Sequence, residues 1–333
     1  MQKRILVSIF LFAMILMSGV ARAERKTVLI INSYHPVFPW VKSHNAALEG
    51  ALADTVDLSF FNMDIKRLPS DKYSGQVTSA LDVFHETRPD LVVLTDDFAL
   101  KSLGPIITRE GTPVVYLGVN TNPRRYLEDM RLVTGILERP LFKRSIVYLK
   151  DVFGDSLQKC LVLFDDSVTS RAIKDYVFKG DDRLVFTQTV MDLKLNNRLE
   201  DWKRVVLNAK EYGYDVIMVG LYHTLVDGKG RHVDDAMVIR WLSCNSPVPV
   251  FGFWDFSIGK GKAVGGLVFA GNPQGKEAAK LVLRILDGER VQSVHPITTE
   301  SGEFVFSRFE LARWGIALPS SFFGSTIPVI FQE

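Results

Sequence analysis

The first apolar run of the sequence ends in a loop whose side chains are typical of a binding site. Val28 to Ile31 reads as a buried strand, and polar and aromatic residues follow it at once. The candidates in this loop are Asn32, Ser33, Tyr34, His35 and Trp40. Aromatic rings offer faces for stacking and short polar side chains offer hydrogen bonds, so we expect the loop to form one wall of a ligand cleft.

Later predicted strands end in the same kinds of side chain. The candidates that follow them are Asp96, Asn120, Asp165, Tyr222, Trp254 and Asp255. In open parallel sheets, ligands bind beyond the carboxyl ends of the strands, because the loops converge there and helix N-termini present unpaired amides. We therefore expect these side chains to join the first loop in contacting a ligand.

Ordinary structural roles are alternatives for some of these positions. An Asp, Asn or Ser after a strand commonly caps the next helix, and this alternative applies to Asp97, Asn122 and Ser167. Trp40 can be a core residue of the helix that follows the first loop. The binding interpretation depends on the collective placement of the set, since each signal alone is weak.

The motifs for catalysis and for metal binding are incomplete in this sequence. "HETRP" at His85 lacks the second histidine of a zinc helix, "GFWDFSIGKG" has the wrong glycine spacing for a phosphate loop, and no Gly-x-Ser-x-Gly occurs. An acid/base pair made of Asp96 and Asp165 across a cleft is the enzymatic alternative. We expect a binding protein that is not an enzyme, with no catalytic residue, metal or cofactor.

Uniformly apolar strands alternate with amphipathic helices along the chain. This pattern predicts an α/β fold with parallel sheets covered on both faces. The alternation starts afresh with a helix over 141–153 and the strand "CLVLFDD". A chain of 333 residues exceeds the roughly 250–300 residues at which single cores stop growing, so two lobes are expected. Near the C-terminus, "HPITTESGEFVFS" predicts a hairpin.

The N-terminus predicts export. Lys3 and Arg4 precede an apolar run, and the stretch at 21–23, Ala-Arg-Ala, is a small-x-small cleavage pattern. The run is shorter than the roughly 20 residues of a membrane span. We expect residues 1–23 to be a cleaved signal peptide and the mature protein to be periplasmic; an uncleaved anchor is the alternative.

Loss of the first 23 residues leaves 37 basic against 38 acidic residues, because Lys3, Arg4 and Arg22 leave with them. A near-neutral protein lacks the basic excess that binding to a phosphate backbone requires. Nucleic acid is therefore not expected as a partner.

Four stretches carry a family likeness: "NSYHPVFPW", "PDLVVLTDDFALK", residues 251–289 and "FSRFELARWGIALP". Together they resemble the type I periplasmic substrate-binding proteins, in the ABC-transporter substrate-binding branch that also occurs as the sensing region of histidine kinases and diguanylate cyclases. The resemblance implies two hinged Rossmann-like lobes joined by three crossovers. The N-terminal lobe would hold 26–135 and 257–290, and the C-terminal lobe 136–256 and 291–333.

The resemblance also implies the function. The protein would capture a small organic ligand between its lobes for the permease of an ABC importer; the alternative is a sensory subunit that presents ligand status to a membrane kinase or cyclase. The many carboxylates argue against a strongly anionic ligand, because unpaired buried charge is costly. An amino acid, amine or sugar-like solute is expected.

The family's strand order also bears on the two cysteines, Cys160 and Cys244. In that order they lie three strand spacings apart, roughly 14 Å at about 4.8 Å each. A disulfide needs Cα atoms within about 7 Å. We therefore expect two free, buried thiols, with a bridge brought about by a loop as the alternative.

Overall fold

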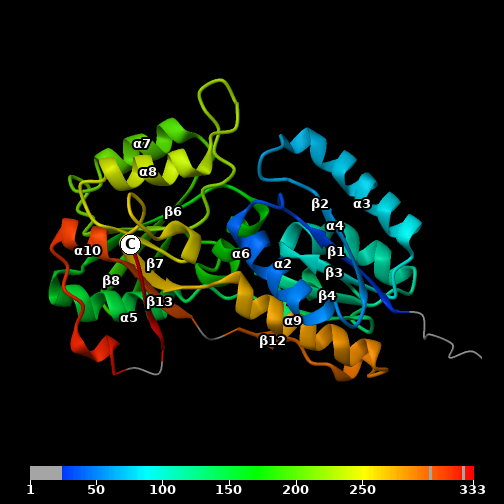
Figure 1. Ribbon diagram of the computed structural model, residues 1–333. Coiled ribbons are helices and arrows are strands. Elements are labelled where there is room, and N and C mark those ends of the chain that lie inside the picture. Colours follow the sequence, from blue (N-terminus) through cyan, green and yellow to red (C-terminus); the bar gives the residue numbers. More distant parts are fainter. Residues whose placement is uncertain (1–24, 300–301, 325–326) are drawn as a thin grey trace, which may run out of the picture.

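The computed structural model describes residues 25–299, 302–324 and 327–333. It has two lobes, each built on a central sheet covered by helices (Figure 1). The predicted signal peptide, residues 1–23, lies outside the described residues. Within the part of the chain that is described, no helix is both long enough and apolar enough to cross a membrane.

The N-terminal lobe is built on a six-stranded sheet in the order β12-β5-β4-β3-β1-β2, in which every neighbouring pair is parallel. Its strands are β1 Thr27–Asn32, β2 Asp57–Asn62, β3 Leu91–Thr95, β4 Val114–Val119, β5 Val133–Leu137 and β12 Ile297–Thr298. Its helices are α2 Pro39–Leu52, α3 Tyr73–Thr87, α4 Asp96–Arg109 and α9 Gly271–Leu286.

Both faces of this sheet are buried, which is why its strands are uniformly apolar. In β1, Val28 and Ile30 pack with residues of α2 and α9, whereas Leu29 and Ile31 pack with residues of α3 and α4. Successive side chains of a strand point to opposite faces, so one short apolar run serves two cores.

The C-terminal lobe is built on an eight-stranded sheet in the order β14-β13-β11-β10-β9-β6-β8-β7. Its strands are β6 Lys159–Phe164, β7 Arg183–Phe186, β8 Thr189–Leu195, β9 Val216–Val219, β10 Val250–Gly252, β11 Gly265–Val268, β13 Glu303–Ser307 and β14 Val329–Gln332. The pairs β11–β13 and β7–β8 are antiparallel and the other pairs are parallel. The two-lobed α/β architecture that the sequence predicts is confirmed.

The helices of this lobe are α5 Phe142–Phe153, α6 Val168–Val177, α7 Leu199–Leu207, α8 Asp235–Asn245 and α10 Arg308–Trp314. Short 3-10 turns in the two lobes lie at Ser70–Lys72, Pro123–Arg125, Gly154–Ser156, Asp255–Ser257, Val291–Ser293 and Ser320–Phe322.

Two whole strands lie in a different sheet from the one that the predicted lobe boundaries imply. Strand β11, predicted within the N-terminal stretch 257–290, pairs with β10 and β13 in the C-terminal sheet. Strand β12, predicted within the C-terminal stretch 291–333, pairs with β5 in the N-terminal sheet. The hairpin predicted over 295–307 is therefore wrong, because β12 and β13 belong to different sheets.

Two adjacent glycines explain how β11 fits into the C-terminal sheet. A Cβ atom on Gly265 would lie 2.1 Å from the ring of Phe306, and one on Gly266 would lie 2.1 Å from the carbonyl oxygen of Gly252. Neither position has room for a larger residue. The "GG" of this segment therefore reflects close packing within a strand.

Both cysteines are free thiols, so they do not bridge. Cys160 is buried in β6 as expected, but Cys244 is exposed, and its predicted burial is wrong. The buried face of α8 is formed by Val238, Ile239, Leu242 and Ser243, and the next residue along the helix turns away from that face.

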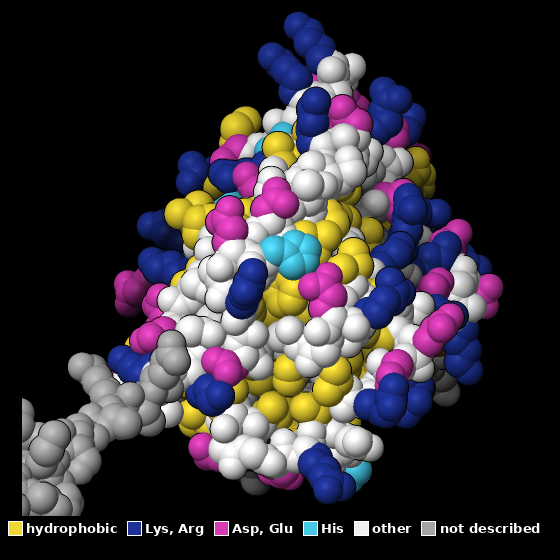
Figure 2. Space-filling view, turned by 90° about the vertical axis from the view of Figure 1, so that its right-hand side faces the viewer, with side chains coloured by type: hydrophobic (Ala, Val, Ile, Leu, Met, Phe, Trp, Pro, Cys, Tyr) yellow, Lys and Arg dark blue, Asp and Glu magenta, His cyan; other side chains and the backbone are white. Residues whose placement is uncertain are grey.

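The side of the molecule that lies at the right of Figure 1 carries both signs of charge. Acidic and basic side chains are interspersed over it with small apolar areas between them (Figure 2). Surfaces that bind a nucleic-acid phosphate backbone have Lys and Arg clustered on one face, and among the described residues this face has no such cluster.

Candidate functional site

The carboxyl ends of both sheets converge on one inner space between the lobes. From the N-terminal lobe it is lined by residues that follow β1, β2, β3 and β5, and from the C-terminal lobe by residues that follow β6, β9 and β10. Its lining residues are Tyr34, Phe38, Trp40, Lys66, Asp96, Glu138, Thr169, Leu221, Trp254 and Phe256. The space measures about 10 Å³, which is room for about one water molecule.

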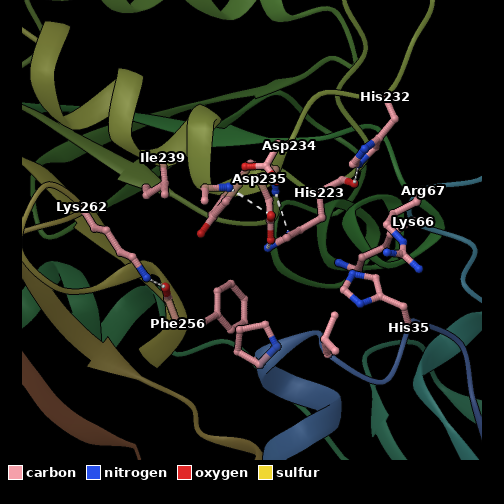
Figure 3. A pocket seen from close by; sticks show the side chains of 14 residues that line it. His35, Lys66, Arg67, His223, His232, Asp234, Asp235, Ile239, Phe256 and Lys262 are labelled. Atoms are coloured by element: carbon pink, nitrogen blue, oxygen red, sulfur yellow. Dashed lines mark hydrogen bonds and ion pairs between the residues drawn. The ribbon is translucent and has the colours of Figure 1, made fainter.

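A larger cavity of about 500 Å³ lies at the mouth of the cleft. Figure 3 shows its walls: His35, Lys66 and Arg67 come from the N-terminal lobe and face Asp235 and Ile239 of the C-terminal lobe across an open volume. A third cavity, of about 380 Å³, lies between the lobes and is lined by Tyr73 and Arg171 among others. Ligand sites in proteins typically have volumes of about 300–1,000 Å³.

Six of the eleven predicted site residues line this cleft. Those at the inner space are Tyr34, Trp40, Asp96 and Trp254, and those at the mouth are His35 and Tyr222. The core alternative for Trp40 also has support, since its ring is buried against the N-terminal lobe. Trp40 nevertheless lines the cleft, and its buried Nε1 has no hydrogen-bond partner in the described part of the chain.

Asn32 and Ser33 hold the N-terminal lobe together behind the cleft. The hydroxyl of Ser33 donates to the carbonyl of Thr95 at 2.6 Å and accepts from the amide of Ala99 at 3.0 Å, which ties α4 to β1. The Oδ1 atom of Asn32 accepts from His44 Nε2 at 2.9 Å and from the Thr95 hydroxyl at 3.2 Å. The side chains of Asn32 and Ser33, both predicted to contact ligand, thus form hydrogen bonds within their own lobe.

Asp165 has the same supporting role in the C-terminal lobe. One carboxylate oxygen accepts from the amides of His223 and Thr224 at 3.0 and 3.1 Å, and the other accepts from the Ser170 hydroxyl at 2.6 Å. The carboxylate is fully buried and shapes the loop after β9. A direct contact between Asp165 and a ligand is therefore not favoured.

Asn120 and Asp97 form the matching arrangement in the N-terminal lobe. The Asp97 carboxylate accepts from the amides of Asn120 and Thr121, each at 2.9 Å. The amide group of Asn120 donates to Glu138 at 3.4 Å and reaches the cleft only through that residue. Asp255 is half-buried, and burial raises its pKa to about 6.

Lys66 is the most unusual of the cleft residues that the sequence prediction missed. Its side chain is 4% exposed and lines all three cavities. Among the described residues, its Nζ has no hydrogen-bond partner; it lies 4.3 Å from the centre of the Tyr34 ring and 4.7 Å from that of Phe38. Burial lowers the pKa of this ammonium group, since the charged form is desolvated.

The loop after β2 aims Lys66 inward. The amide of Met63 donates to the carbonyl of Asn32 at 2.9 Å, and the amide of Ile65 donates to that of Ser33 at 3.1 Å, so the loop runs beside the end of β1. The neighbouring Arg67 turns back to the carboxylate of Asp64 at 2.5 Å. Lys66 lies slightly farther from the end of its strand than most of the predicted residues do from theirs, but the same rule, that residues after strands gather at the cleft, applies to it.

Two buried carboxyl groups share the inner space with Lys66. Asp96 has φ of 66°, a left-handed conformation that Asp tolerates better than most residues, and its pKa is raised by burial and by Glu138. Glu138 accepts from Trp254 Nε1 at 3.3 Å and from Gln274 Nε2 at 3.0 Å. Burial raises the pKa of Glu138 to about 7.

Aromatic contacts join the two lobes over the inner space. Phe38, 1% exposed, packs against His223 and Phe256 of the C-terminal lobe with ring centres 4.7 and 5.4 Å apart. The Tyr34 hydroxyl lies 3.1 Å from that of Thr169. The lobes are therefore in the closed arrangement. Within the described part of the chain, no group of three or more His, Cys, Asp or Glu is arranged to hold a metal ion.

No protein-family model matches the sequence, and no curated protein sequence matches it. Solved structures do match its fold. An ABC domain from Streptococcus pneumonia in complex with L-Trp superposes with a TM-score of 0.66 at 15% identity, over 92% of this chain and 100% of that one. A ligand-free, open substrate-binding protein from Clostridium difficile superposes with a TM-score of 0.61 at 15% identity, over 93% and 100%.

The same fold also serves other functions. The transcription regulator CcpA of Lactococcus lactis matches with a TM-score of 0.55 at 11% identity, over 84% of this chain and 97% of that one. These similarities show that the chain has the type I periplasmic binding-protein fold, as its sequence predicts. The function must be argued from the site, because one fold hosts several functions.

Proposed function

We propose that this protein is an exported solute-binding protein that captures a small organic ligand between its two lobes and delivers it to the permease of an ABC importer. The observation that carries the proposal is the convergence of both sheets' carboxyl ends on a cleft with a buried ammonium group that has no hydrogen-bond partner among the described residues. A hydrophobic core that binds no ligand is not expected to contain such a group, since burying an unpaired charge is costly. A ligand would compensate it.

Capture depends on the closed arrangement. Contacts such as that between Tyr34 and Thr169 exist only while the lobes are together, so a ligand that touches both lobes favours the closed form. Binding then shifts an equilibrium between open and closed forms. The closed surface is what the permease would recognise, and no step of this cycle requires a catalytic residue or cofactor.

The test is a thermal-shift screen of the purified mature protein against amino acids, polyamines, sugars and nucleosides. A compound that binds the native state raises the melting temperature by mass action, by an amount that grows with concentration. We expect at least one class to produce such a shift, with a one-to-one stoichiometry in calorimetry. A screen in which no class of solute binds would contradict the proposal.

Export and output are tested separately. N-terminal sequencing of protein from the periplasmic fraction should find a chain that begins near Glu24. Loss of uptake of the bound solute in a strain lacking this gene, restored by the gene in trans, would support the importer. Unchanged uptake together with a lost transcriptional or second-messenger response would support the sensory alternative.

A further inference from the structure

The charges at the centre of the cleft narrow the chemistry of the ligand, an inference that rests on the proposed function. Lys66 and Asp96 both line the inner space, yet they do not hydrogen-bond each other. Asp96 receives one 3.3 Å hydrogen bond, from the Thr95 hydroxyl, and Lys66 donates none to the described residues. A buried amino group and a buried carboxyl group thus stand apart, each with hydrogen-bonding capacity left for a guest.

Other acidic groups near Lys66 are already engaged. Asp165 accepts three hydrogen bonds within its own lobe. Asp235 lies 3.6 Å from His223 and also accepts from the amide of Ala236. Glu138 accepts from Trp254 and Gln274. Asp96 is therefore the carboxylate of the cleft with the most capacity for a cationic group.

The ligand classes differ in how well they satisfy this pair. A plain amine would pair with Asp96 and leave Lys66 unpaired and repelled. A plain acid would do the reverse, beside the carboxylates of Asp96 and Glu138. Uncharged hydroxyls would hydrogen-bond to both groups but supply no opposite charge, so neither buried group would gain a counter-charge.

We infer that the ligand is a zwitterion of amino-acid type, with its acidic group bound to Lys66 and its ammonium group bound to Asp96. A second unpaired donor, Trp40 Nε1, lies close to Asp96: both side chains flank Gly118, where an added Cβ would lie 3.1 Å from Asp96 Oδ1 and 3.5 Å from Trp40 Nε1. The acidic group of the ligand supplies the acceptor that this indole lacks.

The cavities leave room for an apolar side chain on such a ligand. The inner space and the 500 Å³ mouth share Lys66 and Phe256, so a charged head at the centre can continue into the mouth. The mouth wall includes Val37, Ala236 and Ile239. Ile239 is labelled in Figure 3. Because the closed inner space holds only about one water, the head must enter while the lobes are apart, and the lobes must close less tightly around it than they do here.

Calorimetry with the full-length mature protein tests the inference. The standard amino acids are titrated first, and the best binder is compared with its decarboxylated amine and its deaminated acid. For tyrosine these are tyramine and 3-(4-hydroxyphenyl)propanoate. We expect each analogue to bind about 10- to 100-fold more weakly, since each loses one charge-assisted contact.

Two variants assign the contacts. Lys66→Met should weaken binding of the amino acid about 10- to 100-fold and change binding of the amine little. Asp96→Asn should weaken binding of the amino acid by a similar factor and change binding of the deaminated acid little. Lys66→Met should also raise the melting temperature of the ligand-free protein, because it removes an unpaired buried charge. The control is Lys72→Met, at a lysine whose side chain is 66% exposed.

The outcomes separate the inference from the proposed function. If sugars, polyamines or nucleosides bind and no amino acid does, the inference is wrong and the solute-binding function stands. If the amine or the acid binds as tightly as its amino acid, or if Lys66→Met binds the amino acid unchanged, the inference is also wrong. If no solute of any class binds, the proposed function itself fails.

Discussion

The hydroxyl of Tyr34, which follows β1 in the N-terminal lobe, lies 3.1 Å from the hydroxyl of Thr169 in the first turn of α6 in the C-terminal lobe. The two residues are 135 positions apart in the sequence, and both side chains line the inner space. This contact links the site to the closed arrangement, because it can form only when the lobes meet.

Removal of this contact should loosen the closed form. Tyr34→Phe and Thr169→Val each delete one buried hydroxyl of the pair, at a net cost of about 1 kcal/mol. We expect amide hydrogen exchange in the loops at the cleft to speed up about fivefold in either variant. The double variant should exchange no faster than the singles, since one interaction is lost in all three. Tyr212→Phe, at an exposed tyrosine, is the control. Additive effects in the double variant would contradict the assignment.

Asp165 should matter for folding. Asp165→Ala leaves the amides of His223 and Thr224 without their acceptor, and an unsatisfied buried group costs about 1–3 kcal/mol. We expect the free energy of unfolding, measured by urea titration, to fall by about 3 kcal/mol in this variant.

The neighbouring residue provides the matched control. Asp166 forms an exposed ion pair with Arg171, so Asp166→Ala should cost less than about 1 kcal/mol. Equal losses of stability in the two variants would show that the hydrogen bonds of Asp165 do not hold the loop.

Glu138 should make the ligand-free protein less stable as pH rises. Burial raises its pKa from 4.5 to about 7, so between these values the folded state binds more protons than the unfolded state. Stability therefore falls across this window as pH rises, by on the order of 3 kcal/mol in the limit. Urea midpoints at pH 5 and pH 7.5 should show this decline in the wild type and a much smaller one in Glu138→Gln.

A surface glutamate serves as the control for that experiment. Glu277 pairs with Lys280 on the outer face of α9, and Glu277→Gln should leave the pH dependence as it is in the wild type. If Glu138→Gln retains the full decline between pH 5 and pH 7.5, Glu138 is not its source.

The two thiols should differ in reactivity. Cys244 is exposed, whereas Cys160 is fully buried in β6 and burial raises its pKa. Thiolate is the reactive form, so N-ethylmaleimide should modify Cys244 within minutes in the native protein and Cys160 only after unfolding. Mass spectrometry of the intact protein and its peptides reads this out. Rapid double modification of the native protein, or a disulfide between the two residues, would contradict the structure.

Much of the fold could be predicted from the sequence because parallel sheets bury both faces. The apolar runs at Val28 and Leu91 and the helix predicted over 141–153 correspond to β1, β3 and α5. The crossovers were harder to place, because no break in composition marks where the chain leaves one sheet. Strand β12 is two residues long, and only its pairing with β5 assigns it to a lobe.

The site was predicted as a region, and individual roles were not. Six of the eleven residues expected at the site line the cleft, but hydrogen bonds decide which side chains are free to face a guest. Asp165 and Ser33 are occupied by their own lobes, whereas Lys66 is not. No local pattern distinguishes these cases, because the distinction depends on contacts between residues that are distant in the sequence.

The measurement that tests the central claim most directly is a crystal structure of the mature protein with the tightest-binding solute from the screen. We predict that the solute lies between the lobes, with an acceptor group within hydrogen-bonding distance of Lys66 Nζ and contacts to both Tyr34 and Trp254. A solute bound on the outer surface of one lobe, with the cleft closed and Lys66 still unpaired, would contradict the account.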